Sequence, residues 1–326
     1  MKRVLLSSTL LILSACYTEG SKNQVLSQTF VHKYGFETSE KDWEERDQDG
    51  QVVSVLKSGV KLSQSYENGK LHGLTTYTFP NSSVIEKQQL FDEGLLLKEQ
   101  LNDLSGMPIR EEIYEFGNRI IVTLWDEKGV PLSIEEYDDE LLMEAKYYTP
   151  DHELEAVVAA GIGERVKRDR SGLLISRDKI ENGIMSCHTT YHPNGNIHTI
   201  SHYNQYQLHG KQMKFTASGK PLMELNWHRN QLDGPKIIYR NGQKIVVIPY
   251  INGKKEGTEL HYDDLGYLTA EIEWRDDKKH GASVLHSEEG SQTEWFFKGQ
   301  TVRADRFKLL DQRDQISAEF RQDSIE

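Results

Sequence analysis

Glycines recur through this chain at a nearly constant interval, and this repeat limits the folds that the chain can adopt. In the C-terminal half the successive spacings are 23, 24, 23, 24 and 24 residues, over Gly172, Gly195, Gly219, Gly242, Gly266 and Gly290. Upstream, Gly106 and Gly129 are 23 residues apart, and larger gaps of 47 and 43 residues fit two units each, at Gly59–Gly106 and Gly129–Gly172. A short unit repeated many times predicts an architecture in which each unit buries its apolar side against its neighbours.

Each unit carries two further marks. An aromatic residue stands eight positions after the glycine at Tyr114, Tyr137, Tyr203, Trp227, Tyr250 and Trp274. Between units we expect a short polar turn that closes on a second glycine, at His72-Gly73, His209-Gly210, Asp233-Gly234, Glu256-Gly257 and His280-Gly281. Every unit is therefore expected to contain two strands and two turns, because glycine supplies the positive φ that tight hairpin turns require.

Apolar and polar residues alternate along the expected strands. One face of a strand takes Leu268, Ala270, Ile272 and Trp274, and another takes Met223, Leu225 and Trp227. A period of two predicts strands with one packed face, whereas a helix needs apolar residues three and four positions apart. We predict an all-β fold, an elongated antiparallel meander or solenoid of stacked hairpins of about 23 residues over 30–302. Residues 303–326 are expected to form a short cap helix or a tail, and residues 153–163 read almost helical.

These units resemble MORN repeats, chiefly the short bacterial variant. The best match, Tyr66-Glu67-Asn68-Gly69-Lys70-Leu71-His72-Gly73, resembles the family core Y-x-x-G-x-x-x-G, and an aromatic strand and a turn follow it up to Asn81. Residues 186–281 match the variant four times in succession, and the resemblance covers about residues 50–300. Ser82-Ser83 departs from it by replacing the expected turn glycine. The resemblance implies an extended surface for a partner, and the antitoxin-like label of the bacterial family implies a dedicated one.

The N-terminus has the features of an export signal. Lys2 and Arg3 precede an apolar stretch, Val4–Leu13, that is too short to span a membrane as a helix. The stretch ends in Leu-Ser-Ala-Cys, which resembles the bacterial lipobox. We expect residues 1–15 to be removed, Cys16 to carry the lipid anchor, and residues 16–29 to form a polar tether. The resemblance implies a lipid-anchored protein of the bacterial cell envelope, and Tyr17 in place of Asp favours the outer membrane. An ordinary signal peptide that happens to contain a cysteine is the alternative.

Charge and cysteine content exclude several classes of protein. The net charge is −12, and loss of Lys2 and Arg3 with the signal makes it −14 (−12 minus 2). This charge repels phosphate backbones and anionic headgroups, so we expect no nucleic-acid partner and membrane attachment through the lipid alone. Cys187 is the only cysteine besides Cys16. We therefore expect no disulfide scaffold, and Cys187 is either a small buried residue or a free thiol.

Histidines form the one cluster with metal-binding chemistry. With a three-residue turn, one hairpin face would carry His188, His192, His198 and His202. Neutral imidazoles can bind zinc or copper, but side chains on a flat strand face converge poorly on one ion. We therefore predict no metal and no cofactor.

The sequence contains no nucleophile elbow, Walker loop or His-Glu-x-x-His motif. His72, His209 and His280 recur at one position of the unit, which is expected of turn residues, and the acidic pairs Asp138-Asp139 and Asp263-Asp264 fall in expected turns. We predict no catalytic residue and no enzymatic activity.

The aromatic row leaves two interpretations open. Tyr203, Trp227, Tyr250 and Trp274 can pack within the sheet, or a partly open row can stack on a glycan or an apolar peptide. We expect a non-catalytic, membrane-anchored scaffold or binding module for an envelope or extracellular protein. An antitoxin-like neutralising partner and a hydrolase of envelope glycans are the alternatives.

Overall fold

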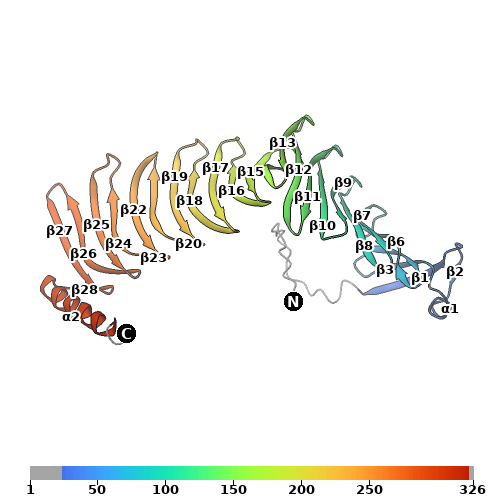
Figure 1. Ribbon diagram of the computed structural model, residues 1–326, viewed down its shortest axis with the longest axis horizontal. Coiled ribbons are helices and arrows are strands. Elements are labelled where there is room, and N and C mark those ends of the chain that lie inside the picture. The colour runs from blue at the N-terminus through green and yellow to red at the C-terminus, as the bar shows by residue number, and fades with distance from the viewer. Residues whose placement is uncertain (1–23, 323–326) are drawn as a thin grey trace. The chain divides into compact units, whose positions relative to one another are not determined.

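The computed structural model describes residues 24–322, and its strands form a 28-stranded sheet in which neighbouring strands run antiparallel. Successive strands pair with one another as hairpins, which confirms the predicted all-β meander (Figure 1). The signal segment, Cys16 and most of the expected tether lie outside the described residues. β1 begins at Val25, within the segment expected as tether.

Two compact units divide the chain, and the first comprises residues 1–116 with 120–124. Its elements are β1 (Val25–His32), β2 (Glu37–Thr38), α1 (Glu40–Glu45), β3 (Gly50–Leu56), β4 (Lys61–Glu67), β5 (Lys70–Leu71), β6 (Gly73–Thr78), β7 (Ile85–Asp92), β8 (Leu95–Asn102), β9 (Pro108–Tyr114) and most of β10 (Arg119–Trp125). Short helix α1 begins at an N-cap serine, Ser39, whose hydroxyl accepts the Asp42 N–H, and it buries Trp43.

The second unit comprises residues 117–119 and 125–326. Its first strands are β11 (Pro131–Asp138), β12 (Leu141–Tyr148), β13 (Leu154–Ala159), β14 (Ile162–Arg168) and β15 (Leu174–Glu181). The regular repeats follow as β16 (Ile184–Tyr191), β17 (Ile197–Asn204), β18 (Gln207–Phe215), β19 (Pro221–His228), β20 (Gln231–Leu232), β21 (Gly234–Arg240), β22 (Gln243–Ile251), β23 (Lys254–Lys255), β24 (Gly257–Tyr262), β25 (Leu268–Arg275) and β26 (Lys278–Ser287). The last elements are β27 (Gly290–Phe297), β28 (Gln300–Val302) and α2 (Ala304–Gln322).

Residues 153–163, which read almost helical, keep the predicted β fold, because this segment forms β13, a two-residue turn and the start of β14. Ala160 and Gly161 both have positive φ, which is the geometry of a tight hairpin turn and cannot continue a helix. Of the alternatives for the C-terminal segment, the structure has the helix. α2 packs against β27, where the Phe307 ring lies 5.2 Å from that of Trp295.

The turns at the two ends of the strands differ. At one end an aspartate often begins the turn, and its carboxylate accepts backbone N–H groups inside the turn, as Asp263 does from Leu265 and Tyr267 at 2.9 and 2.8 Å. At the other end two residues with positive φ join the strands, as at Asn252-Gly253. The sequence thus encodes the turns at the two strand ends with different residues, and the repeat glycine lies at the end where aspartate often begins the turn.

The second glycine of the unit is not in a turn, contrary to the prediction. Gly234 and Gly257 begin strands β21 and β24, several residues after the tight turns at 229–230 and 252–253. Their φ angles are +109° and +99°. The tight turn takes its positive φ from residues such as Asn252, and the later glycine instead marks an irregularity at the point where the strand resumes.

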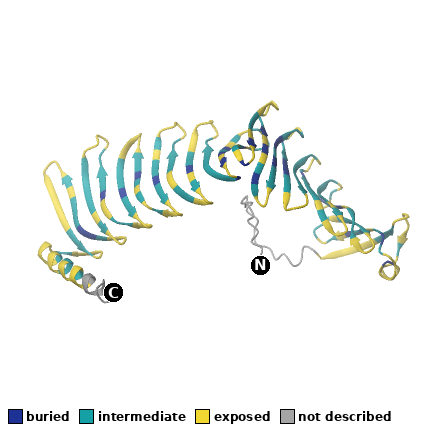
Figure 2. Ribbon diagram, in the orientation of Figure 1, coloured by how far each residue is buried: buried dark blue, intermediate teal, exposed yellow. Residues whose placement is uncertain are grey.

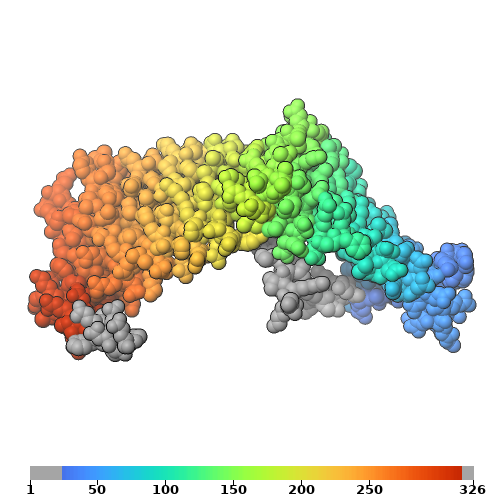
Figure 3. Space-filling view, in the orientation of Figure 1, coloured from blue at the N-terminus to red at the C-terminus, as the bar shows by residue number. Residues whose placement is uncertain are grey.

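Side chains in the middle of the strands are the most buried (Figure 2). One buried hydrophobic cluster lies in the second unit, over Leu142, Ala145, Tyr147, Val158, Val166 and Ile180. In the regular repeats that follow, side chains of neighbouring strands pack into a continuous surface (Figure 3).

Candidate binding faces

The predicted aromatic row lies on one face of the repeats, and three of its members lie directly across from a glycine. The pairs are Trp227 with Gly210, Tyr250 with Gly234, and Trp274 with Gly257. The same pairing recurs at Tyr66–Gly50, Phe91–Gly73 and Phe296–Gly281. A glycine has no side chain to occupy the space above the strand, so the ring can cover the neighbouring backbone.

At several of these glycines the preceding residue accepts a hydrogen bond from the next hairpin. Asn252 N–H donates to the Asp233 carboxylate at 3.4 Å, and Asp276 N–H donates to Glu256 at 2.8 Å. At the last repeat Lys298 N–H donates to His280 Nδ1 at 3.4 Å. These positions therefore link adjacent repeats, which explains why acids and histidines replace one another there.

A second aromatic row, which the sequence analysis did not identify, lies on the opposite face. Directly paired residues cross this face in order: Ile200, Met213, Glu224, Ile237, Val247 and Leu260. On every second strand an aromatic residue stands two positions after the residue of this row, or after its paired neighbour. These aromatic residues are Tyr191, Phe215, Tyr239 and Tyr262. Because side chains alternate along a strand, these four share the face of the crossing row. We call the two rows together the apolar strip.

Two aliphatic residues at register shifts of the repeats are exposed. Leu222 is 44% exposed and lies at the shift between β18 and β19, where Phe215 pairs with Pro221. Ile175 is 48% exposed and lies at the shift between β14 and β15, where Arg168 pairs with Leu174. The aromatic side chains are only partly buried. Single exposed aliphatic residues are ordinary on a protein surface, so the recurring, partly buried aromatic rings are the feature that distinguishes this face.

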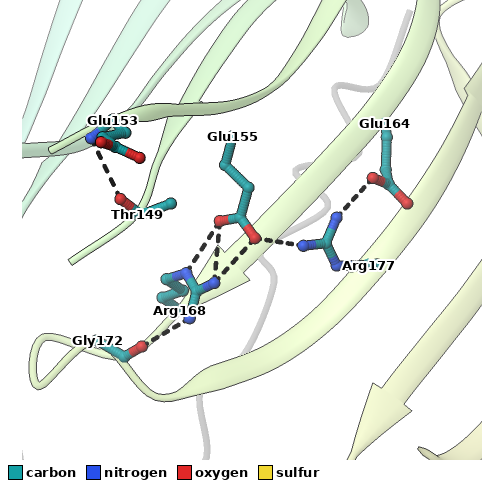
Figure 4. Close-up of polar contacts among 7 residues, drawn as sticks. All are labelled: Thr149, Glu153, Glu155, Glu164, Arg168, Gly172 and Arg177. Atoms are coloured by element: carbon teal, nitrogen blue, oxygen red, sulfur yellow. Dashed lines mark hydrogen bonds and ion pairs between the residues drawn. The ribbon is translucent and has the colours of Figure 1, made fainter. Parts of the chain in front are cut away.

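A network of ion pairs continues the face beyond the strip (Figure 4). Arg168 holds the Glu155 carboxylate with two donor nitrogens, Nη2 at 2.9 Å from Oε1 and Nε at 3.1 Å from Oε2, and its Nη1 donates to Gly172 O. Arg177 contacts Glu155 as well and reaches Glu164 at 2.7 Å. Since Arg177 pairs with Thr189, and Thr189 pairs with Ile200, the network lies at the N-terminal end of the strip.

The face that carries the predicted aromatic row also carries a buried polar cluster. Asp178 is fully buried between Arg165 Nε at 2.9 Å and His188 Nδ1 at 2.5 Å. Burial alone raises the pKa of Asp178, but the hydrogen bond from His188 and the Arg165 charge overcome it and hold that pKa below its usual value. Tyr137 and Tyr147 donate to Glu135 at 2.6 and 2.8 Å. Burial raises the pKa of both phenols, so both stay protonated donors.

A similar carboxylate lies beside Trp274. Glu259 is buried and contacts Lys255 Nζ at 3.0 Å and His261 Nε2 at 2.7 Å. Burial raises the pKa of Glu259, yet these hydrogen bonds and charges leave it lowered. Lys255 Nζ also lies 4.1 Å from the Trp274 ring centroid, so this ring already has a cation on it.

The four histidines do not share one face, contrary to the prediction. His188 pairs with Ser201, whereas His202 pairs with the adjacent Cys187, so these two histidines point to opposite faces. The connection between β16 and β17 has five residues rather than three, and the register shifts beside it. Each ring has its own partner: His192 Nε2 donates to Phe215 O, and His202 Nδ1 donates to Lys211 O.

Within the described residues, no three histidine, cysteine, aspartate or glutamate side chains are grouped as ligands for a metal ion. Cys187 is a free, partly buried thiol, and burial raises its pKa. Neither helix of the described chain is long and apolar enough to cross a membrane.

The fold and its surfaces define a class of protein, a β-hairpin repeat protein with extended aromatic and apolar faces. The MORN repeat variant family matches residues 187–205, which run from within β16 through β17 into the next turn. This match supports the MORN-repeat interpretation, and a repeat sheet of this type is typical of a binding module. None of the curated proteins compared matches the chain.

Proposed function

We propose that this chain is a non-catalytic binding module, anchored to a bacterial envelope membrane by a lipid on Cys16, that holds a protein partner along its repeats. The observation that carries the proposal is the recurrence of partly exposed aromatic side chains at equivalent positions of successive repeats, on both faces of the sheet. A repeat array presents such positions at a fixed interval, which suits a long ligand better than a small substrate.

The anchor is supported by the sequence of the N-terminus. Leu-Ser-Ala-Cys follows a short apolar stretch, and two or three acyl chains on Cys16 would give stable attachment. The partner is then a protein of the same compartment or of its surroundings.

Crosslinking in intact cells tests the proposal with the full-length protein. We expect the wild-type chain to retain a specific protein, and at least one of two double variants to reduce that yield about tenfold: Trp227→Leu with Trp274→Leu, or Tyr239→Ala with Tyr262→Ala. Tyr206→Ala, at an exposed turn tyrosine, is the matched control. Cys16→Ala should lose an acyl-chain label and leave the membrane fraction.

Equal yields from wild type and both double variants would refute the binding role. An acyl label of equal strength on Cys16→Ala would refute the anchor alone. Release of product from peptidoglycan or glycan by the purified protein would instead support the hydrolase alternative.

A further inference from the structure

We propose that one end of the strands β16–β22 binds an acidic segment of the partner protein, an inference that rests on the proposed function and names the chemistry of the contact. The residues concerned lie in and beside the turns that join β16 to β17, β18 to β19 and β21 to β22. These turns follow one another along the same end of the strands (Figure 1). We call this stretch, residues 191–198, 214–220 and 239–244, the basic rim.

The basic rim belongs to a block of positive charge within an acidic chain. Residues 184–262 contain nine lysines and arginines against four acids, and no aspartate or glutamate occurs between Glu181 and Glu224. On either side the balance reverses. Residues 125–183 contain fifteen acids against eight lysines and arginines, and residues 263–302 contain nine against four. A ligand of negative charge is therefore attracted to this block and repelled by its flanks.

The turns of the basic rim lack the carboxylate that other turns at this strand end contain. Asp169 and Asp263 stand three residues before the repeat glycine and accept backbone N–H groups. The rim has His192 and Thr216 at this position, and the Thr216 hydroxyl accepts the Lys220 N–H at 3.1 Å. A neutral hydroxyl thus takes the structural role of the carboxylate, and the turn is kept without its negative charge.

The cations of the rim are open to a ligand. Lys220 and Lys244 are exposed and Lys214 is partly exposed. Among the residues that the structure describes, none of these three ammonium groups contacts a carboxylate. Arg240 contacts Asp264 at 3.3 Å, but the two side chains are 62% and 69% exposed. An ion pair this exposed contributes little stability, so a carboxylate of a ligand can compete for Arg240.

The rim is also held in place by hydrogen bonds between neighbouring turns. Asn194 and Asn196 each donate from Nδ2 to Ala217 O, at 2.7 and 2.8 Å, and these bonds tie the first turn to the second. An aromatic residue of the second row stands beside each turn, at Tyr191, Phe215 and Tyr239. A ligand would therefore meet cations and rings in alternation along a surface that is already ordered.

A shallow hollow beside Lys244 provides the most complete contact position. It is lined by Gln243, Lys244, Tyr262 and Gly266. A carboxylate in this hollow can contact the Lys244 ammonium, while an apolar side chain next to it in the ligand covers the Tyr262 ring. The segment that fits best therefore has acidic residues next to apolar ones.

The length of the rim favours a short protein segment over a long polyanion or a membrane surface. Successive turns are two strands of the main ladder apart, or about 9.6 Å, so the three turns span about 19 Å and about six extended residues cover them. A longer polyanion would reach the acidic residues 125–183 or 263–302 and be repelled by them. A short acidic segment stays within the positive block.

Fluorescence anisotropy of labelled peptides with the full chain tests the inference. The probe is a synthetic peptide of four Asp-Glu-Phe triplets, and a peptide of four Asn-Gln-Phe triplets keeps the rings without the charge. We expect saturable binding of the acidic peptide and about tenfold weaker binding of the neutral one. Binding of the acidic peptide should weaken between about 0.01 and 0.15 M salt, because the Debye length falls from about 30 to 8 Å.

Two pairs of substitutions place the binding at the rim. Lys220→Glu with Lys244→Glu should weaken the acidic peptide about tenfold, whereas Lys220→Arg with Lys244→Arg keeps the charge and should keep the binding. The matched control is Lys278→Glu with Lys308→Glu, which changes the net charge equally at exposed lysines outside the block. This control should stay within about twofold of the wild-type affinity. Circular dichroism checks that each variant keeps its β structure.

Absence of saturable binding, equal binding of the two peptides, or equal weakening by the rim variant and the matched control would overturn the inference. Binding of a long polyphosphate or of phosphatidylglycerol vesicles that the rim variant abolishes, without binding of the acidic peptide, would overturn it in favour of a phosphate ligand. A crosslinked cellular partner that the rim variant retains in full refutes this inference alone. Peptide binding without any crosslinked partner refutes the proposed function and leaves the rim as a site for acidic ligands.

Discussion

The strands β11–β15 and the regular repeats that follow them bury their apolar side chains in different ways. Seven of the buried hydrophobic residues lie in β11–β15, whereas three lie in the longer stretch β16–β28. The first region converges on a local core around Leu142 and Tyr147, which are 2% and 1% exposed. The second region covers its strands with aromatic rings across from glycines, as at Trp274 and Gly257.

This difference shows what a repeat protein gains from its glycines. Where the glycine–aromatic pair is present, each hairpin is stabilised by its neighbours and keeps apolar side chains partly exposed on both faces. Where the glycine spacing fails, between Gly129 and Gly172, burial becomes local and polar groups such as Asp178 are enclosed. We infer that β11–β15 contribute rigidity, while the regular repeats provide the surface that a ligand can use.

The largest expected effect comes from the enclosed cluster. Asp178→Ala leaves the Arg165 guanidinium and the His188 ring without their carboxylate in a buried setting, which typically costs about 3–5 kcal/mol. Glu181→Ala on the same strand removes an exposed pair with Lys179 and should change stability little, because solvent screens such a pair. Urea unfolding of both variants measures the difference. If the two variants were equally stable, the enclosed cluster would not be the stabilising element of β11–β15.

A smaller effect is expected from the glycines of the regular repeats. Gly234 has φ +109°, and a Cβ there would lie 3.1 Å from that of Asn226. Gly234→Ala should therefore destabilise the chain by about 1–3 kcal/mol and disturb Tyr250, its cross-strand neighbour. Ser218→Ala in an exposed turn is the control. Thermal unfolding followed by tryptophan and tyrosine fluorescence measures it, and an unchanged midpoint would mean that the ring–glycine pairs are dispensable.

Much of this comparison could be predicted from the sequence, because the repeat is encoded locally. The spacing of glycines and the period-two alternation indicated the hairpins, and Met223, Leu225 and Trp227 alternate as expected. Residues 153–163 read almost helical because Glu153, Leu154 and the following alanines have helical propensity, and pairing with β12 and β15 makes them strands. Tertiary pairing decided this segment, and a single sequence does not show it.

Only part of the candidate surfaces could be predicted from the sequence. The glycine-plus-eight aromatics were found, but their pairing with a glycine on the preceding strand depends on register, which spacing alone does not fix. The band of Tyr191, Phe215, Tyr239 and Tyr262 was not identified, although each residue stands at or near the end of a strand in its unit. The histidines were assigned to one face because a shorter turn was assumed, and a register shift of one residue reverses a face.

The smallest expected effect concerns the contact of α2 with the last strands, where the regular repeats end. Asp311 accepts hydrogen bonds from His280 Nε2 and Arg275 Nη1, both at 3.0 Å. The hydrogen bond from His280, followed by that from Arg275 and their charges, holds the pKa of Asp311 below its usual value. A carboxyl with a lowered pKa in the folded state stabilises the fold above its ordinary pKa, and that contribution is lost as pH falls through the lowered value.

Asp311→Asn should therefore loosen α2 by about 1–2 kcal/mol at neutral pH, and the wild-type helix should loosen in the same way below about pH 4. Hydrogen exchange of the α2 amides measures both, while exchange in β11–β15 should not change. Asp314→Asn removes an exposed pair with Lys298 and should have the smaller effect. If Asp314→Asn loosened α2 more than Asp311→Asn, surface charge rather than the His280 contact would hold the helix. The end of the array would then be stabilised differently from its enclosed carboxylates at Asp178 and Glu259.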